Sequence, residues 1–123
     1  MTTARASIPR YDAANANRFG PCMIEHRTAG TGLSQLGTYF MIYDTDGHSE
    51  PWTLHYEETV YVIEGQVRLI TVENDTDREL TGDPGDLIVL PKGTTVRYGA
   101  AVGTRLLLSI SPVDWRERVD GLT

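Results

Sequence analysis

The side chains most able to do chemistry occupy alternate positions of one short segment, P-W-T-L-H-Y-E-E. They are Trp52, Leu54, Tyr56 and Glu58. On a β-strand all four would share one face, because successive strand residues point to opposite sides. A carboxylate beside aromatic rings can serve as an acid, a base or an anchor for a small organic cation, and cation–π attraction adds about 0.5–2 kcal/mol. Glu57 would face the other way, so the two adjacent glutamates cannot act on one substrate.

The three histidines are weaker candidates. His48 lies in the turn D-T-D-G-H-S-E, where neighbouring carboxylates could complete a hard-cation site, although a solvated turn explains the same residues. His55 would join Glu58 only if a β-bulge reversed the side to which it points. His26, within C-M-I-E-H-R, has no motif around it and is expected to be a partly exposed strand residue.

Turn signals divide the chain into short segments of high β-propensity. Clusters rich in glycine, proline, aspartate or asparagine occur at 28–32, 44–47, 73–77, 83–86, 91–93 and 99–103. Short strands at this spacing predict an all-β barrel or sandwich. Residues 1–22 lack sustained periodicity and are predicted to form an N-terminal arm, so that the barrel domain spans 23–123. The tail at 113–119 predicts one short C-terminal helix.

Two of the predicted strands, at 60–63 and 87–90, are apolar at both alternating sets of positions. Both of their faces should therefore be covered. A barrel packed against a second copy would cover them, so we expect a homodimer.

The composition excludes several classes of function. The 123 residues fit one domain, and the net charge of −6 would repel a phosphate backbone, so nucleic acid is not an expected partner. No apolar run approaches the ~20 residues that span a bilayer, so no membrane partner is expected. A single cysteine, Cys22, and the lack of a charged-then-apolar leader predict a cytoplasmic protein.

Two glycine-containing motifs resemble the signature hairpins of the cupin superfamily. Glu58 followed six residues later by Gly65 matches the end of the first motif, and G-D-L-I-V-L-P-K-G at 85–93 matches the second. The histidines that bind metal in many cupins are absent from both. Other residues stand at those three positions: Trp52 and Leu54 (Pro51 and Thr53 with the alternative spacing) and Val96.

The run P-W-T-L-H-Y-E-E-T-V-Y-V-I-E-G at 51–65 is similar to the cupin domain of ethanolamine-utilisation protein EutQ. The similarity continues through 85–96 and through L-L-L-S-I-S-P-V-D-W at 106–115. It implies a single-domain cupin, an RmlC-like jelly-roll β-barrel that is usually dimeric and lacks the histidine triad. For that family, an acetate kinase activity and a role in bacterial ethanolamine catabolism have been proposed.

The resemblance also implies that Glu58 points into the barrel. Strand alternation then directs Tyr56, Leu54 and Trp52 inward, and Val96 and Tyr98 of the second hairpin join them. These residues would form an aromatic and aliphatic pocket around one carboxylate. In the alternative interpretation, which we weigh equally, the same side chains are ordinary core.

A lone buried carboxylate is unfavourable, so Glu58 needs compensation. A hydrogen bond from Tyr56, an arginine such as Arg97 or Arg105, or a bound cation could supply it. A paired Glu58 would be structural, whereas an unpaired one is a candidate acid, base or amine-binding group.

The leading functional prediction is a EutQ-like cupin that binds a small polar or cationic metabolite inside the barrel. Glu58 and Tyr56 are the polar anchors and the candidate catalytic residues, and the predicted walls are Trp52, Leu54, Val96 and Tyr98. One alternative is a small enzyme with lyase, isomerase or acyl-phosphate chemistry that uses Glu58 as a base or metal ligand. Another is a non-catalytic dimeric scaffold. No cofactor is expected, although a divalent metal could bind a remnant site formed by Glu58 with His48, His55 or Tyr56.

Overall fold

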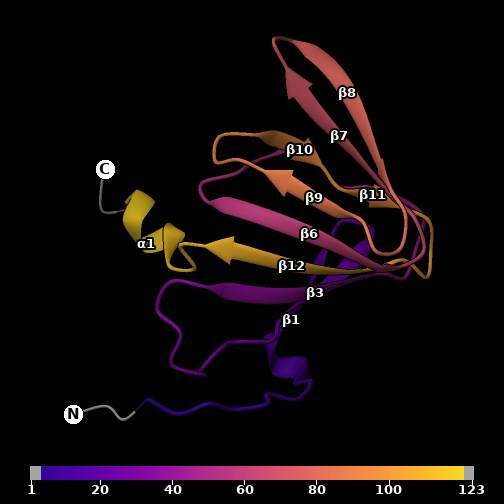
Figure 1. Cartoon of the computed structure of the whole chain (residues 1–123). Helices are drawn as coiled ribbons and strands as arrows, with labels where there is room; N and C mark the ends of the chain where they lie inside the picture. The colour runs from indigo at the N-terminus through magenta and orange to yellow at the C-terminus, as the bar shows by residue number, and fades with distance from the viewer. Residues whose placement is uncertain (1–3, 121–123) are drawn as a thin grey trace.

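The computed structural model describes residues 4–120 (Figure 1). Within this range the bounds of the elements are as follows: a 3-10 turn η1 Ala13–Asn15, then β1 Ala16–Phe19, β2 Cys22–His26, β3 Gly37–Tyr43, β4 Gly47–His48, β5 Trp52–Thr53, β6 Glu57–Glu64, β7 Val67–Glu73, β8 Thr76–Gly82, β9 Leu87–Leu90, β10 Thr95–Arg97, β11 Gly99–Ala100, β12 Arg105–Ser111 and the helix α1 Trp115–Asp120. The all-β class and the short C-terminal helix that the sequence predicts are both confirmed.

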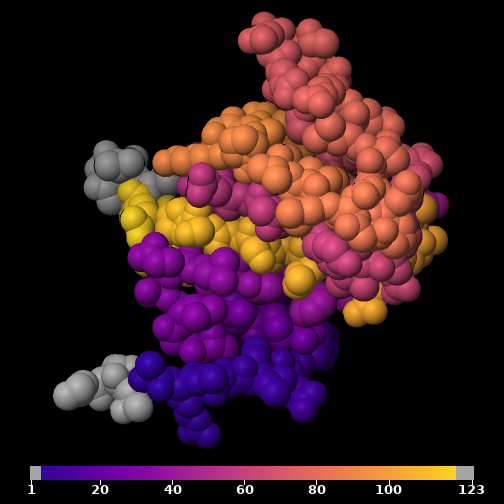
Figure 2. Space-filling model, viewed as in Figure 1, coloured from indigo at the N-terminus to yellow at the C-terminus, as the bar shows by residue number. Residues whose placement is uncertain are grey.

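The strands form two antiparallel sheets. The first, sheet A, has the order β1-β2-β3-β12-β6-β9, and the second, sheet B, has the order β4-β11-β7-β10-β5 with β8 added beside β7. Strands that are distant in sequence lie side by side, as where β12 sits between β3 and β6. Two layers with this crossed order form a jelly roll. The β7–β8 hairpin stands out from the body, and α1 lies at one end of the strands (Figures 1 and 2).

The core lies between the sheets and follows from strand alternation. Along β12, Leu106, Leu108 and Ile110 are buried, while the residues between them are less so. The same period of two appears in β6, where Val60 and Val62 are buried. Because inward side chains of both sheets meet in one layer, each buried apolar residue packs against the opposite sheet as well as its own neighbours.

The N-terminal arm is shorter than the predicted 1–22. Phe19 pairs with Cys22 across a tight hairpin in which Gly20 has φ +58°, so β1 and β2 add to the edge of sheet A. The polar residues Asn17 and Arg18 interrupt the alternation of apolar and polar residues, so the sequence pattern did not predict this strand. Of the described arm residues, only 4–12 precede any regular element.

The predicted turn at 99–103 begins too early, because Gly99 and Ala100 form β11. Gly99 pairs with His48 of β4, and a side chain at Gly99 would overlap the imidazole ring. A glycine required by close packing was therefore read as a turn signal. Among the described residues, no helix has the length and apolar character needed to cross a bilayer.

The outer face of β6 and β9 is uncovered in the single chain, so its covering by a second copy stays a prediction. The inward residues of these strands are buried or half-buried, whereas Tyr61, Leu87 and Val89 are exposed. Leu87 pairs with Tyr61 in the β6–β9 register, so the exposed groups are neighbours. This apolar area lies at an edge of the sheet, because β9 is its last strand.

Candidate functional site

The segment from Trp52 to Glu58 keeps its alternation as it passes from one sheet to the other. Trp52 lies in β5 of sheet B, and Glu58 lies in β6 of sheet A. Between them, two backbone hydrogen bonds tie Leu54 to the β9–β10 loop: its N–H donates to Thr94 O, and its carbonyl accepts from Gly93 N, both at 2.9 Å. The chain bends at His55 and Tyr56 before β6 begins, yet burial still alternates, and the predicted inward orientation of Leu54, Tyr56 and Glu58 is matched by their burial.

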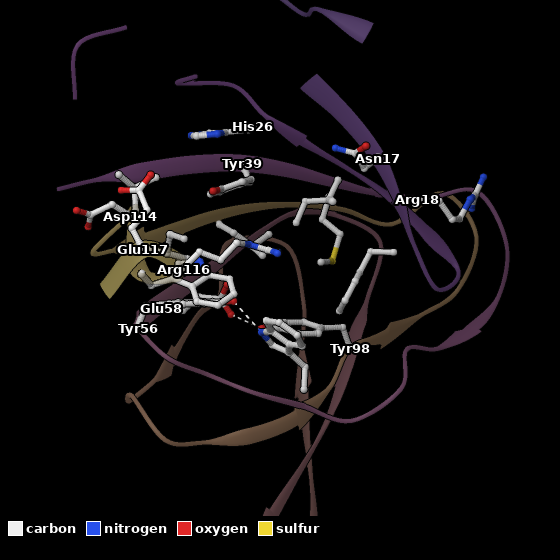
Figure 3. A pocket seen from close by; sticks show the side chains of 18 residues that line it. Asn17, Arg18, His26, Tyr39, Tyr56, Glu58, Tyr98, Asp114, Arg116 and Glu117 are labelled. Carbon is white, nitrogen blue, oxygen red and sulfur yellow. Dashed lines mark hydrogen bonds between the residues drawn. The ribbon is translucent and has the colours of Figure 1, made fainter. Parts of the chain in front are cut away.

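Tyr98 lies between β10 and β11 of sheet B, opposite Glu58 of sheet A, and is held in place by Ser49. The backbone N–H of Tyr98 donates to Ser49 Oγ at 2.9 Å, and the N–H of Ser49 donates to the Tyr98 carbonyl at 2.7 Å. These bonds hold the phenol ring across the interior. Its hydroxyl donates to Glu58 Oε1 at 2.6 Å, the distance of a charge-assisted hydrogen bond (Figure 3).

Glu58 is a buried carboxyl group with little compensation. Burial raises its pKa to about 7, and the hydrogen bond from Tyr98 only partly opposes that rise. Burial, followed by the nearby charge of Glu58, also raises the pKa of Tyr98, so its hydroxyl stays a donor. Near neutral pH the carboxyl group therefore exists in both protonation states.

None of the residues proposed from the sequence as partners of Glu58 takes that role. The Tyr56 hydroxyl instead accepts a hydrogen bond from Trp52 Nε1 at 2.9 Å. Arg97 donates to the Ser49 carbonyl, and Arg105 pairs with Glu64 at the surface. The partner is Tyr98, which the sequence placed only in the apolar wall.

A cavity of about 610 Å³ opens beside Glu58 (Figure 3). This volume lies in the range of small-molecule sites. Its lining combines aliphatic and charged side chains with six aromatic ones: Phe19, Tyr39, Trp52, Tyr56, Tyr98 and Trp115. Four of the six predicted site residues therefore line the cavity, namely Trp52, Tyr56, Glu58 and Tyr98. Leu54 and Val96 are fully buried in the core and are not among the lining residues.

Several lining residues carried no recognisable signal in the sequence. His26 and Tyr39 lie opposite each other in the β2–β3 register, and their rings stack at 4.4 Å. His26 is half-buried, as predicted, but it also lines the cavity. Burial lowers its pKa, so the neutral imidazole is favoured. Neither strand carries a motif, and only the sheet register could have revealed the pair.

The helix α1 completes one end of the cavity with Trp115. This ring packs edge-on against Trp52 at 5.7 Å and lies 5.5 Å from both Tyr56 and His55. The following residue, Arg116, lines the cavity and is exposed. The aromatic wall thus comes from both sheets and from the helix.

The candidate cation site near His48 does not assemble. Asp44 pairs with Arg18 at 2.6 Å, and Asp46 accepts a hydrogen bond from the Val102 N–H at 2.7 Å. His55 lies on the outward side of its segment, stacked on Trp115. Within residues 4–120, no group of three or more histidine, cysteine or acidic side chains comes together as a metal site.

Comparison with known proteins supports the resemblance that the motifs indicate. Residues 7–117 match the family described as ethanolamine utilisation protein EutQ. Over 107 residues the chain is 32% identical to acetate kinase EutQ of Salmonella typhimurium, a similarity that covers 87% of this chain and 43% of that protein. The chain thus spans less than half the length of this curated relative.

Solved structures support the fold. The structure of a putative ethanolamine utilization protein Q from Salmonella typhimurium has a TM-score of 0.65 and 25% identity, and the match covers 79% of this chain and 78% of that one. Oxalate decarboxylase from Bacillus subtilis has a TM-score of 0.72 at 17% identity, with 94% of this chain and 32% of that one covered. The second likeness concerns the fold alone. The predicted cupin jelly roll is confirmed.

Proposed function

The chain belongs to the ethanolamine utilisation protein EutQ family, and from that premise we propose that its cavity binds a small polar or cationic metabolite, with Glu58 as the anchoring carboxylate. Tyr56 and Tyr98 supply hydroxyl groups beside it. Leu54 and Val96 are buried behind the lining residues, so in this proposal they support the pocket without touching the ligand. A cytoplasmic location belongs to the same proposal, because the single cysteine is a free, buried thiol rather than half of a disulfide.

The observation that carries this proposal is the state of the Glu58 carboxyl group. Oxygen Oε1 accepts the Tyr98 hydrogen bond, whereas Oε2 accepts none from the described residues. The side chain also lines the cavity, so Oε2 is open to a ligand. A cation or a hydrogen-bond donor placed there would offset the cost of burying the negative charge, which the Tyr98 bond offsets only in part.

The aromatic walls favour a small organic cation over an inorganic one. Trp52 and Trp115 line the same cavity as Glu58, and aromatic rings attract a desolvated ammonium group by up to about 2 kcal/mol. A metal ion would instead require several oxygen or nitrogen ligands. Glu58 is the buried carboxylate of the lining, because Asp114 is paired with Arg118 and Glu117 is exposed. One buried carboxylate beside phenol groups suits an amine or amino alcohol better.

Calorimetric titration with ethanolamine and a series of other small amines tests the proposal. At pH 8 the wild type should bind at least one of them, and Glu58→Gln should weaken that binding at least tenfold. Glu57→Gln is the matched control, because Glu57 is adjacent in sequence, carries the same charge and points to solvent. Binding should also weaken as the pH falls below about 7, because protonation of Glu58 removes the negative charge.

Metal analysis of the purified protein should accompany these titrations. If no amine binds at pH 8 and a divalent metal is retained through Glu58, the remnant metal site replaces this proposal. If neither binds, and Glu58→Gln only stabilises the fold, the barrel is a scaffold with a filled interior.

An enzyme that uses Glu58 as a general base is the second candidate, and the pKa of about 7 favours it. A base is most effective when its pKa lies near the working pH. The relatives named acetate kinase suggest acyl-phosphate chemistry as the first reaction to assay. Formation of acetyl phosphate from acetate and ATP, trapped with hydroxylamine, should be lost in Glu58→Gln and kept in Glu57→Gln if this candidate holds.

A further inference from the structure

The cavity beside Glu58 has a second charged side chain at its α1 end. Arg116 lines the cavity and is exposed, whereas Glu58 exposes only 4% of its surface. Both side chains lie around the same space in Figure 3. The cavity therefore has a carboxylate in its interior and a guanidinium group where it opens to solvent.

The guanidinium group of Arg116 packs over the neighbouring aromatic ring. Its Cζ atom lies 4.8 Å from the centroid of the Trp115 ring, a cation–π contact. The Trp115 ring lies 5.5 Å from the ring of Tyr56, and Tyr56 shares the inward side of its segment with Glu58, two residues further along. A row of side chains in contact thus leads from Arg116 toward Glu58.

The positive charge of Arg116 acts on two hydroxyl groups of the cavity wall. Burial raises the pKa of Tyr39 and of Tyr56, and Arg116 opposes both rises, so its guanidinium group lies near both hydroxyls. The pKa of Glu58, in contrast, is set by burial and by the Tyr98 bond. Arg116 is therefore close enough to act on a ligand in the cavity but too far away to neutralise Glu58.

Other charged groups of the lining are already paired. Arg18 donates to Asp44 through both terminal nitrogens, at 2.6 and 2.7 Å. Asp114 pairs with Arg118 at 2.7 Å. The ion pairs formed by the side chains described for residues 4–118 do not include Arg116. Arg116 is thus the cation of the lining that is available to a ligand.

A ligand with a charge of one sign would suit only one end of this cavity. An amine is attracted to the Glu58 carboxylate but is repelled by Arg116, and a simple anion meets the reverse arrangement. A molecule with an ammonium group at one end and an anionic group at the other complements both. Arginine suits the anionic end, because its planar fork donates two parallel hydrogen bonds to a carboxylate or a phosphate.

We propose that the ligand of this cavity is a small zwitterion, with its ammonium group at Glu58 and a carboxylate or phosphate group at Arg116. The inference rests on the proposed function, because it takes Glu58 as the anchor of the amine. The ammonium end enters first, since Glu58 is buried and Arg116 is exposed. Tyr56 and Trp115 then lie along the linker between the two charges, and Arg116 determines specificity.

Calorimetric titration at pH 8 with matched pairs of probes tests the inference. Each pair joins a zwitterion to the amine of the same chain length: β-alanine with propylamine, γ-aminobutyrate with butylamine, and O-phosphoethanolamine with ethanolamine. The wild type should bind at least one zwitterion about tenfold or more tightly than its matched amine, because charge-assisted hydrogen bonds are added. The first two pairs and the third pair distinguish a carboxylate from a phosphate.

Variants of the opening show which residue causes the preference. In Arg116→Gln the two members of each pair should bind with similar affinity, and Arg116→Lys should keep part of the preference, because the charge remains without the fork. Arg105→Gln is the matched control, since Arg105 is exposed, carries the same charge and lies outside the lining. Glu117→Gln removes a negative charge from the next residue of the helix and should not reduce the preference.

The outcomes separate this inference from the proposed function. If the wild type binds amines through Glu58 but zwitterions no more tightly, or if the preference survives in Arg116→Gln, the inference is overturned and the amine site stands. Zwitterion binding that is lost in Arg116→Gln and unchanged in Glu58→Gln would overturn both, because the cavity would then be an anion site. Binding of neither class of probe would also overturn both.

Discussion

Two glutamates of sheet A expose equally little of their surface to solvent, but their pKa values are shifted in opposite directions. Glu25 on β2 and Glu58 on β6 each expose only 4% of their surface. Arg27 donates to Glu25 Oε1 through two nitrogens, at 2.8 and 3.1 Å, and the Asp12 N–H donates to Oε2 at 3.0 Å. These bonds, the Arg27 pair above all, hold the pKa of Glu25 below its ordinary value.

Glu58 receives one neutral donor, the Tyr98 hydroxyl, and its pKa rises to about 7 because burial outweighs that bond. The comparison shows that a low exposed fraction alone does not identify a functional carboxylate, because Glu58 lies deeper in the protein than Glu25 and has weaker partners. Both carboxylate oxygens of Glu25 accept hydrogen bonds, one of them from the Arg27 guanidinium, so Glu25 is a structural group that anchors the arm. One open oxygen facing a cavity makes Glu58 the group that still lacks a partner.

The largest expected effect is the stabilisation of the fold by Glu58→Gln at high pH. The folded-state pKa of Glu58 is raised from 4.5 to about 7, so its contribution to stability is full below 4.5 and is lost as the pH rises through about 7. The total loss is roughly 3 kcal/mol. Glutamine cannot ionise and can still accept the Tyr98 bond. Urea denaturation should show the variant more stable than the wild type at pH 8, with the difference shrinking toward pH 5.

Glu57→Gln is the control for that experiment, because it removes the same charge from an exposed position of the same strand. Its stability should follow the wild type at both pH values. Parallel pH profiles of Glu58→Gln and the wild type would show that Glu58 is compensated in solution, and the contrast with Glu25 would disappear.

The second largest expected effect is a loss of stability, caused by Glu25→Gln. Glu25→Gln should lower the free energy of unfolding at pH 7 by about 1–2 kcal/mol, because charge-assisted bonds from Arg27 are lost. The pKa of Glu25 is lowered in the folded state, so its contribution is present above 4.5 and is lost as the pH falls through the folded value. Denaturation at pH 7 and pH 3 should show a larger difference at pH 7 than at pH 3. A variant as stable as the wild type at pH 7 would mean that the pair adds nothing.

The smallest expected effect is that of Tyr98→Phe, which tests whether the Tyr98 hydroxyl lowers the pKa of Glu58. Tyr98→Phe removes the one donor that Glu58 has within residues 4–120, so the pKa of Glu58 should rise further, and the protein should lose about 1 kcal/mol at pH 8. Carbon-13 NMR of labelled glutamate carboxyl groups follows the titration directly. Tyr56→Phe is the matched control, since that hydroxyl bonds to Trp52 instead of Glu58. An unshifted Glu58 titration in Tyr98→Phe would show that the 2.6 Å bond has no influence in solution.

The inward orientation of Glu58 and its neighbours could be predicted, because it depends on local geometry. Strand alternation has a period of two and needs no knowledge of the other sheet, so the pattern from Trp52 to Glu58 survives the passage between sheets. The short C-terminal helix could also be predicted from a local pattern, because Trp115 and Val119 are four residues apart in the sequence. The strand at 16–19 was missed, because its polar residues pair with β2 only through the sheet edge.

The sequence by itself determined which side chains point inward between Trp52 and Glu58, and through its hairpin motifs it determined the jelly roll that carries them. Only the tertiary structure decided what those side chains meet. Tyr98 reaches Glu58 across the gap between two sheets, and His26, Tyr39 and Trp115 join the cavity through sheet register and the placement of a helix. Such contacts join residues far apart in the chain, and no local repeat encodes them. The pKa of Glu58, which depends on burial and on one partner 40 positions away, therefore follows from the folded structure alone.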